Sequence, residues 1–394
     1  MPLTRRRLFQ QLVARDAPLV NHEWISDRGR EAGRAASVEQ PSPAGARQVR
    51  ISSNENPLGP GQHVLDAIAG KFSEAARYPF NATQHEGQLP AMIAAKFPGA
   101  TAENVVMGAG SSEILTNAVR AFTSPAKAFA TPWPSFENPH VTAHKIGTPV
   151  REVTLDANLR IDVAATIAAA TGAGLVFFCN PNNPTATVHG HATVADFVRQ
   201  VRAASPDTVI LIDEAYHDYV TDPAYMSAVE IALTTPNVFV ARTFSKAYGM
   251  AGLRIGYAIG HAPTVRRLAA FKLPYGIGTP QIAAMHAGLS NPAHIAAERK
   301  RNTEARSFTL KAFADIGFTA TDSQSNFIFV NLKRPAAPFR DACAAQGVLV
   351  GRDFPPFEKT HCRISIGTMA EMQRAVDVFR KVLGHSTTTS REQR

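Results

Sequence analysis

Residues 242–257 read RTFSKAYGMAGLRIGY and directly follow a short apolar run at residues 237–241. The segment holds one lysine, Lys246, among small residues, hydroxyls and glycines. A compact turn at the end of a strand holds such a lysine still and partly desolvated, which makes its amine nucleophilic toward carbonyls. Thr243, Ser245 and Arg254 add hydroxyls and a guanidinium, which together suit a bound anion. The alternative is an ordinary lysine in a surface loop.

The composition is that of an ordinary globular protein. The chain has 394 residues, of which 45% are hydrophobic and 19% are charged, and this length favours two domains over one small core. Cys179, Cys343 and Cys362 are widely spaced without a CxxC pair, so we expect buried free thiols and neither disulfides nor a zinc site. No uncharged run approaches the length of a membrane span, and we expect no membrane partner.

The net charge of +9 comes in large part from the front of the chain, where residues 1–50 hold nine arginines and five acidic residues. The rest is only mildly basic and lacks blocks of Lys and Arg interleaved with aromatic residues. We therefore expect anionic small molecules as ligands and no nucleic acid.

Residues 1–47 predict a flexible or leader-like segment. Within it, Arg6-Arg7-Leu8-Phe9 resembles the twin-arginine export motif. Gln10, Gln11, Arg15 and Asp16 interrupt the apolar region that a working signal needs. The cytoplasm is therefore the predicted compartment, with export as the alternative.

Order is expected from near Val49, and apolar runs then alternate with helical patterns. Five runs predict buried strands: residues 104–107, 128–130, 175–179, 208–212 and 237–241. Apolar runs without alternation indicate strands covered on both faces of a mainly parallel sheet, so the fold class is α/β. We assign residues 75–280 to this large domain.

The pattern of predicted helices and strands changes after residue 280. Two long helices are expected at 280–289 and 292–313, followed by strands at 326–330 and 362–366 and a closing helix at 369–383. The alternation in 362–366 predicts a half-buried strand. Residues 281–385 with 48–74 form a predicted smaller α+β domain, and residues 386–394 a polar tail.

Three polar residues of different chemistry follow three predicted strands. Asn183, Asp213 and Lys246 each lie at or just beyond a strand end, where ligands bind in such sheets. A fourth strand leads into Gly108-Ala109-Gly110-Ser111-Ser112-Glu113. This turn could bind an anion at the start of a helix through Ser111 and Ser112, or one serine could simply cap the helix.

These residues match the needs of pyridoxal phosphate. Lys246 is expected to form a Schiff base and to move a proton at the substrate Cα. Asp213 is expected to pair with the pyridine nitrogen and keep it protonated, although a lone Asp at a strand end is more often a helix cap. Asn183 and Tyr216 could hydrogen-bond the ring oxygen.

The remaining candidates surround that cofactor. Phe136 could stack on the ring, or it could be plain core packing, as could Tyr216. Ser111, Ser112, Ser245 and Arg254 are expected to bind the phosphate. Arg363 could bind a substrate α-carboxylate through both nitrogens of its fork. We expect no metal.

The chain over residues 51–383 resembles the fold-type I pyridoxal-phosphate aminotransferases, and within them the histidinol-phosphate aminotransferase branch. Six motifs carry the resemblance, in the order usual for that family: Ser53-Asn54-Glu55-Asn56-Pro57-Leu58-Gly59-Pro60; Arg77-Tyr78-Pro79; Pro181-Asn182-Asn183-Pro184-Thr185; Asp213-Glu214-Ala215-Tyr216; Ser245-Lys246 with Ala251-Gly252-Leu253-Arg254-Ile255-Gly256; and Arg363 with Gly367-Thr368.

The resemblance implies a homodimer with shared active sites, in which Tyr78 reaches the cofactor phosphate of the neighbouring subunit. It also implies that Arg352 and Asn54 contribute to substrate binding, with Arg352 near the distal end of the substrate. Two positions depart from the family pattern: Ala186 stands where a glycine is usual, and Phe136 where many relatives have tyrosine. The leader is like that of a subgroup whose substrates need not be histidinol phosphate.

The sequence thus predicts an aminotransferase that moves an amino group from a histidinol-phosphate or aromatic amino-acid type donor to 2-oxoglutarate by a ping-pong mechanism. The alternative is a decarboxylase of the threonine-phosphate type on the same fold. A third hypothesis, a cofactor-dependent DNA-binding regulator, needs a helix-turn-helix domain, for which residues 1–47 are too few and too poorly patterned.

Overall fold

The computed structural model describes residues 48–79 and 82–384. The predicted leader at 1–47 and the polar tail at 386–394 lie outside these residues. None of the helices in the described ranges is both long and apolar enough to cross a bilayer. Cys179, Cys343 and Cys362 are all buried and free, as expected.

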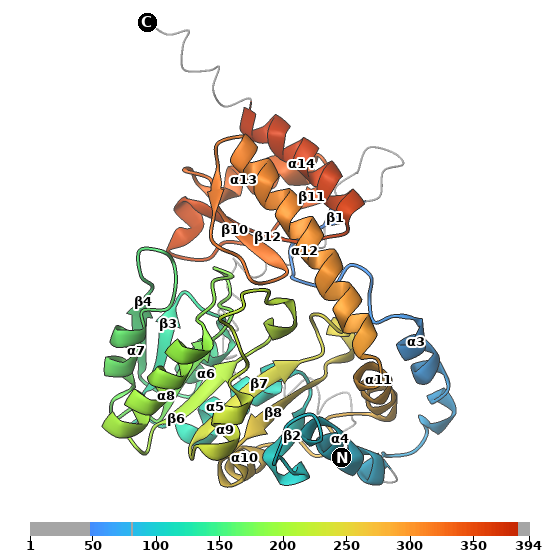
Figure 1. Ribbon diagram of the computed structural model, residues 1–394, viewed down its shortest axis with the longest axis vertical. Helices are drawn as coiled ribbons and strands as arrows, with labels where there is room; N and C mark the ends of the chain where they lie inside the picture. Colours follow the sequence, from blue (N-terminus) through green and yellow to red (C-terminus); the bar gives the residue numbers. More distant parts are fainter. Residues whose placement is uncertain (1–47, 80–81, 385–394) are drawn as a thin grey trace, which may run out of the picture. The chain divides into compact units, whose positions relative to one another are not determined.

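A seven-stranded sheet forms the larger part of the fold (Figure 1). Its strand order is β2-β8-β7-β6-β5-β3-β4, and β8 runs opposite to the other six strands. The sheet is therefore mainly parallel, as predicted. The strands are β2 (Val105–Gly108), β3 (Phe129–Trp133), β4 (Val150–Thr154), β5 (Leu175–Cys179), β6 (Val209–Asp213), β7 (Val238–Thr243) and β8 (Gly256–Gly260).

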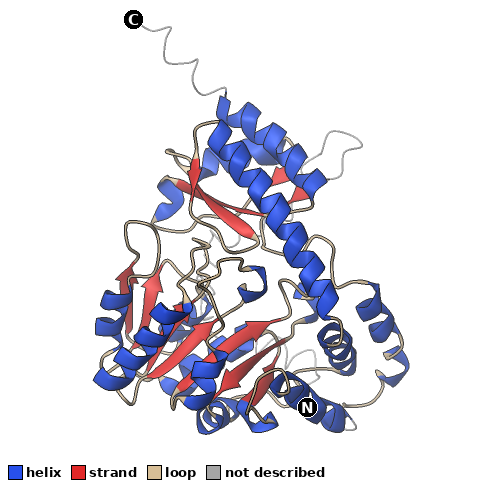
Figure 2. Cartoon of the chain, in the orientation of Figure 1, coloured by secondary structure: helices blue, strands red, loops and turns tan. Residues whose placement is uncertain are grey.

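Helices cover both faces of this sheet, which explains its continuous apolar strands (Figure 2). Neighbouring residues of one strand join different hydrophobic clusters: Phe178 and Ile212 pack in one, Phe177 and Leu211 in the other. The surrounding helices are α4 (Ala82–Ala94), α5 (Ser111–Phe122), α6 (Asn138–Lys145), α7 (Val163–Ala170), α8 (His191–Ala204), α9 (Val229–Thr234) and α10 (Ala262–Ala269).

A second group of elements has its own hydrophobic cluster. It contains the antiparallel sheet β12-β10-β9 and the parallel pair β1-β11. Val49 and Ile51 pack in this cluster with C-terminal residues, whereas Val64 packs with the large sheet. The strands are β1 (Val49–Arg50), β9 (Thr319–Ala320), β10 (Phe327–Asn331), β11 (Val348–Leu349) and β12 (His361–Ser365). The proposed domain boundaries stay a prediction.

Of the remaining helices, α3 and α11 contribute to the cluster of the large sheet, whereas α13, α14 and part of α12 contribute to that of the second group. The long helix α12 extends from beside α11 to α14 (Figure 1). The bounds are α3 (Gln62–Ala69), α11 (Thr279–Leu289), α12 (Pro292–Asp315), α13 (Ala336–Ala345) and α14 (Met369–Gly384).

Two sequence expectations about strands were wrong. Strand β12 is buried at every residue except His361, where a half-buried strand was expected. The polar residues of its alternation, Arg363 and Ser365, form hydrogen bonds inside the protein instead of facing solvent. Strand β3 extends through Pro132 and Trp133, beyond the predicted end at residue 130.

Candidate active site

The carboxyl ends of three neighbouring strands define the site. In the register of the sheet, Asp213 at the end of β6 lies between Cys179 of β5 and Ala241 of β7. The loop after β5 carries Asn183, and the loop after β7 carries Lys246. Sheet order therefore brings the three residues expected at strand ends to one edge.

Asp213 is a buried carboxyl group with 2% exposure. The backbone N–H of Ala215 donates a hydrogen bond to it over 3.2 Å. Burial is the main reason why its pKa rises to about 7. No helix begins at Asp213, since the next helical turn starts at His217 with Tyr216 as its cap residue. The helix-cap alternative therefore does not hold, and a cationic ligand group would stabilise this buried carboxylate.

Lys246 is partly exposed at the same edge. Its Nζ lies 3.4 Å from the carbonyl oxygen of Ser53 and 5.5 Å from the centre of the Tyr216 ring. Burial, followed by the positive charge of Arg363, lowers the pKa of the amine to about 8. An amine with this pKa is partly neutral near physiological pH, as nucleophilic attack on a carbonyl requires.

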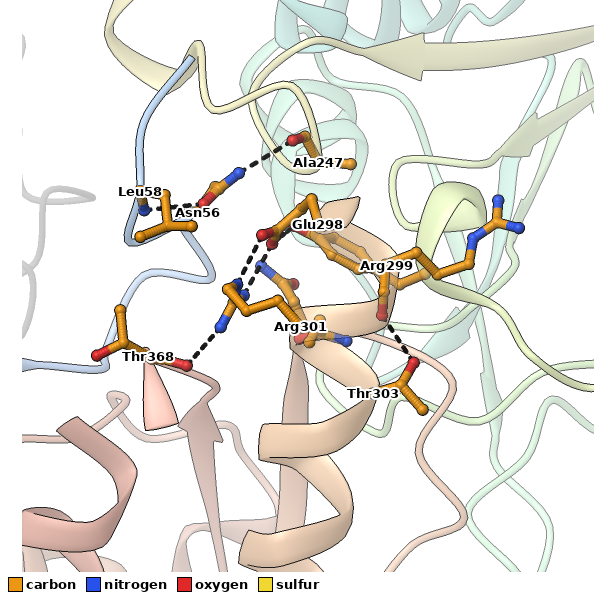
Figure 3. A network of polar contacts seen from close by, with 12 residues as sticks. Asn56, Leu58, Ala247, Glu298, Arg299, Arg301, Thr303 and Thr368 are labelled. Atoms are coloured by element: carbon orange, nitrogen blue, oxygen red, sulfur yellow. Dashed lines mark hydrogen bonds and ion pairs between the residues drawn. The ribbon is translucent and has the colours of Figure 1, made fainter. Parts of the chain in front are cut away.

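The Asn54–Pro60 motif packs against the lysine turn. Asn56 Nδ2 donates to the carbonyl of Ala247 over 3.0 Å, and Asn56 Oδ1 accepts from the N–H of Leu58 (Figure 3). Gly249 has a φ of 69°, and a Cβ there would collide with the backbone at Gly59. The position of Lys246 thus depends on contacts between two distant segments of sequence.

An anion site lies where the turn after β2 meets Arg254. Arg254 has a left-handed backbone, with φ 54°, and donates to Ser245 Oγ over 3.3 Å and to the carbonyl of Ala251 over 2.8 Å. A Cβ on Gly110 would collide with the Arg254 guanidinium. The turn is therefore shaped to bring Arg254 close to the start of α5.

The two serines of that turn are the first residues of α5, and Gly110 is its cap residue without a side-chain bond. Neither Ser111 nor Ser112 is therefore the cap residue of this helix, and the capping alternative does not hold. Backbone N–H groups at a helix start, serine hydroxyls and a guanidinium together suit a phosphate.

Tyr216 and Asn54 form a buried polar pair beside Asp213. Asn54 Nδ2 lies 3.2 Å from the Tyr216 hydroxyl, and Asn54 Oδ1 accepts from Ser365 Oγ over 2.6 Å. Tyr216 also packs edge-on against Phe327, with ring centres 5.0 Å apart. Burial raises the pKa of the Tyr216 phenol well above its usual range, so the hydroxyl stays protonated and can donate.

Arg363 is a buried guanidinium that lacks a carboxylate among its hydrogen-bond partners in the described residues. It donates to Asn183 Oδ1 and to the carbonyl of Ser52, each over 2.8 Å, and its Nε is buried without a partner. Burial lowers its pKa to about 10. An unpaired buried cation is costly, so this site favours an anionic ligand group.

Three further candidates lie at less enclosed positions. Phe136 is partly buried and packs against one core cluster, so core packing accounts for part of its role. Arg352 is exposed, forms an ion pair with Glu137, and lies over the ring of Phe354 at 4.4 Å. Tyr78 is 71% exposed, with its ring centre 5.7 Å from that of Tyr275.

Sequence reasoning assigned no role to Asn56, Ser365 or Glu137. The first two orient candidate residues through hydrogen bonds, and Glu137 neutralises Arg352. Asn56 lies inside a motif that was recognised, which was a usable signal. Ser365 lies 311 residues from Asn54, and no sequence spacing indicates such a contact.

The residues present fit pyridoxal phosphate. The buried carboxyl of Asp213 can receive the pyridine N–H, the glycine-lined turn with Arg254 can receive the phosphate, and Lys246 offers the amine. With the mainly parallel sheet, they define a pyridoxal-phosphate enzyme of fold type I.

The comparisons with known proteins agree. The chain belongs to the family "Aminotransferase class I and II", whose model matches residues 46–379, and it is therefore a pyridoxal-phosphate-dependent aminotransferase. It is 32% identical to a histidinol-phosphate aminotransferase of Moorella thermoacetica, over 85% of each chain. It is 34% identical to an aromatic amino acid aminotransferase of Thermobifida fusca, over 82% of this chain and 86% of the relative.

A solved structure extends the likeness to three dimensions. The histidinol-phosphate aminotransferase of Sinorhizobium meliloti, in complex with pyridoxal-5'-phosphate, superposes with a TM-score of 0.79 at 26% identity. The alignment covers 86% of this chain and 92% of that one.

Proposed function

We propose that the enzyme transfers an amino group from an amino-acid-type donor to a 2-oxo acid such as 2-oxoglutarate, by a ping-pong mechanism in one site. The observation that carries this proposal is the convergence of Lys246 and buried Asp213, at one edge of the large sheet, with buried Arg363 of β12, which contacts Asn183 at that edge. Donor and acceptor both have a carboxylate next to the reacting carbon, so one guanidinium serves both half-reactions.

Each residue then has a defined task. Pyridoxal phosphate, when bound, supplies an electron sink that stabilises negative charge at the substrate Cα. Lys246 holds the cofactor covalently and, when displaced by substrate, carries the proton to and from Cα. Asp213 holds the pyridine nitrogen, and Arg363 holds the substrate carboxylate through paired N–H groups.

The polar residues around these three orient the ring. The protonated hydroxyl of Tyr216 and the amide of Asn183 donate to the ring oxygen, while Asn54 fixes Tyr216 in place. Ser111, Ser112, Ser245 and Arg254 hold the phosphate, and Phe136 covers the ring face. Tightly held groups of this kind keep the reacting atoms aligned, which is the main contribution of the protein to catalysis.

The Arg352–Glu137 ion pair favours an aromatic amino-acid-type donor over histidinol phosphate. Arg352 is the cation expected near the distal end of the substrate, and Glu137 already neutralises it. A doubly charged phosphate would have to displace Glu137 and would remain close to its carboxylate. An uncharged aromatic side chain avoids this repulsion and can pack against the nearby Phe136 and Phe354 rings.

The second candidate reaction is decarboxylation. The L-threonine-O-3-phosphate decarboxylase of Porphyromonas gingivalis has the same fold, with a TM-score of 0.74 at 20% identity. That likeness concerns the fold alone, and the electron sink would serve both reactions.

We also propose a homodimer in which Tyr78 acts on the partner's cofactor phosphate. Two of the large side chains that are at least half exposed, Tyr78 and Tyr275, lie next to each other, and such exposed aromatic side chains are available to contact a second subunit. Five large apolar side chains reach this exposure on the described surface. They are Leu58 at 61%, Phe72 at 62%, Tyr78 at 71%, Leu273 at 60% and Tyr275 at 50% exposure.

A panel of half-reactions tests the proposed reaction. The cofactor-loaded protein is mixed with single amino donors, among them phenylalanine, tyrosine and histidinol phosphate, and its absorbance is followed without acceptor. Loss of the yellow absorbance with an amino acid, and its return with 2-oxoglutarate, is the expected outcome. Carbon dioxide release without any such cycle would support decarboxylation. A protein that binds the cofactor but responds to no donor would contradict both.

A further inference from the structure

We propose that a second site, on the edge of the large sheet, binds one divalent transition-metal ion of the zinc type. Its ligands are His140 and His144 of α6 and Glu152 of β4. One atom from each residue lies within 4.8 Å of the other two. Nothing in the proposed transamination uses these residues, so the site is independent of it.

The local structure explains why the three ligands meet. His140 and His144 are four residues apart on α6, so their side chains lie on the same face, one turn apart. Strand β4 is the last strand of the sheet and pairs with β3, which leads into α6. Glu152 therefore lies beside the histidine pair from the edge of the sheet.

The ligand atoms of the three side chains lie close together. His140 Nε2 lies 2.6 Å from Glu152 Oε1 and also 3.4 Å from His144 Nε2. A proton on His140 Nε2 can serve the carboxylate, and His144 Nε2 can accept a weaker share of it, so a metal ion competes with this hydrogen bond. A metal ion satisfies all three lone pairs together.

The spacing also suits zinc. Donor atoms about 2.0–2.1 Å from a tetrahedral zinc ion lie about 3.3 Å from one another, close to the 3.4 Å between the two histidine nitrogens. Glu152 would have to move away from His140 by about 0.7 Å, from 2.6 Å to about 3.3 Å, which an exposed glutamate can do. Two imidazoles and one carboxylate leave a fourth position for water. Imidazole ligands suit zinc, nickel and copper and disfavour magnesium and calcium.

One of the ligands is held in place before metal binds. The ring of His140 stacks on Trp133, with ring centres 4.1 Å apart and planes 21° apart, and its side chain is only 13% exposed. Such a ring loses little freedom on binding, which favours affinity. The metal would join α6 to β4, and α6 begins directly after the segment with Phe136 and Glu137.

The test is calorimetric titration of the cofactor-loaded, full-length protein with zinc chloride, after removal of metal with a chelator. We expect one ion per chain with a micromolar or lower dissociation constant. His144→Ala and Glu152→Gln should each weaken binding at least about tenfold. Both residues are exposed, so these variants should fold normally even if His140→Ala, which removes the ring stacked on Trp133, does not.

His63→Ala is the matched control, because His63 belongs to another histidine pair. The ring centres of His63 and His294 lie 5.3 Å apart. Zinc binding with the wild-type dissociation constant should persist in this variant. The proposal is overturned if wild type binds no zinc at micromolar concentrations, or if His144→Ala and Glu152→Gln bind it as wild type does.

Discussion

Lys246 illustrates how a residue obtains its chemistry from its surroundings. Burial and the charge of Arg363 lower the pKa of its amine to about 8, whereas an unperturbed lysine has a pKa of about 10.4. Only the neutral amine attacks the cofactor aldehyde. We therefore expect the rate of cofactor uptake by cofactor-free protein to rise with pH with a midpoint near 8, followed by stopped-flow absorbance of the yellow form.

Two arginine substitutions test the cause of this pH profile, one at the site and one away from it as the control. Arg363→Met removes a positive charge that disfavours the ammonium form, so the midpoint should move to higher pH. Arg267→Met removes an arginine that lies over Phe122 instead and should leave the midpoint in place. A profile with the same midpoint in wild type and in Arg363→Met would contradict the assigned cause.

Glu137 is the residue on which donor choice should depend. Glu137→Gln frees Arg352, so kcat/KM for histidinol phosphate should increase about two- to fivefold relative to that for phenylalanine, the size expected for an exposed ion pair. Glu137→Asp retains the charge and should behave more like wild type. The gain should disappear when Arg352→Met is combined with Glu137→Gln. An unchanged ratio in Glu137→Gln would show that the ion pair does not select the donor.

At the scale of elements, the turn between β2 and α5 depends on glycine. Gly110 has φ 79°, and a Cβ there would collide with Arg254, whereas Gly147 has φ 72° with open space around it. Alanine at either position should cost roughly 1 kcal/mol of stability through backbone strain. Only Gly110→Ala should also weaken cofactor affinity, by at least about tenfold, since Arg254 must move.

Fluorescence titration with pyridoxal phosphate measures this difference, and melting curves of both variants measure the shared strain. Equal cofactor affinity in Gly110→Ala and Gly147→Ala would exclude the turn as the phosphate site.

The strands that could be predicted from the sequence are those marked by a run of consecutive apolar residues. Strand β5 was predicted with its correct bounds because Leu175 to Cys179 is an unbroken apolar run between turn formers. Strands β4 and β8 were missed. Val150–Thr154 is mostly exposed at the sheet edge, and Gly256–Gly260 has a glycine at each end, so neither carries the expected apolar pattern.

The candidate site was predictable to a similar extent. Asn183, Asp213 and Lys246 follow strands that are neighbours in the sheet, and strand ends can be recognised one at a time. The contact of Arg363 with Asn183 spans 180 residues, so the chemistry of the guanidinium fork indicated a ligand for Arg363 but not its position beside Asn183. The pairing of Arg352 with Glu137 spans 215 residues and had no signal in the sequence at all.

At the scale of the whole molecule, helix α12 connects the two groups of elements through a buried charge. Glu298, at 3% exposure, accepts from Tyr219 and from two nitrogens of Arg301, and Arg301 also donates to the carbonyl of Gly367 (Figure 3). Arg301→Met leaves the Glu298 carboxylate buried with one partner fewer. We expect a loss of about 2–3 kcal/mol, seen as a lower urea midpoint. Lys300→Met, next to it but exposed, should change stability by less than about 0.5 kcal/mol.

The proposed shared active site makes a prediction that only a mixed dimer can test. Lys246→Ala should be inactive, and Tyr78→Ala should bind pyridoxal phosphate weakly and be nearly inactive at low cofactor concentration. If Tyr78 acts on the partner's cofactor, a dimer with one chain of each kind has one site with both wild-type residues. Co-expressed, differently tagged chains purified as mixed dimers should then recover up to about half of the wild-type activity.

Tyr78 acting within its own chain predicts the opposite result. Each site of the mixed dimer would then keep one defective residue, and its activity would not exceed the mean of the two parent variants. The same comparison with Arg254→Ala in place of Tyr78→Ala is the control. Arg254 contacts Ser245, next to Lys246 in its own chain, and so belongs to the same site as that lysine. That mixed dimer therefore has no site with both wild-type residues, and its activity should not exceed the mean of the two parent variants. Recovery in the Tyr78 pair without recovery in the Arg254 pair is the result expected if Tyr78 acts on the partner's cofactor. A second mixed dimer, of the double variant Tyr78→Ala/Lys246→Ala with a wild-type chain, gives the reverse pattern. If Tyr78 acts across the interface, the site of the wild-type chain lacks its tyrosine and is nearly inactive. If Tyr78 acts within its own chain, that site is intact and the dimer has half of the wild-type activity.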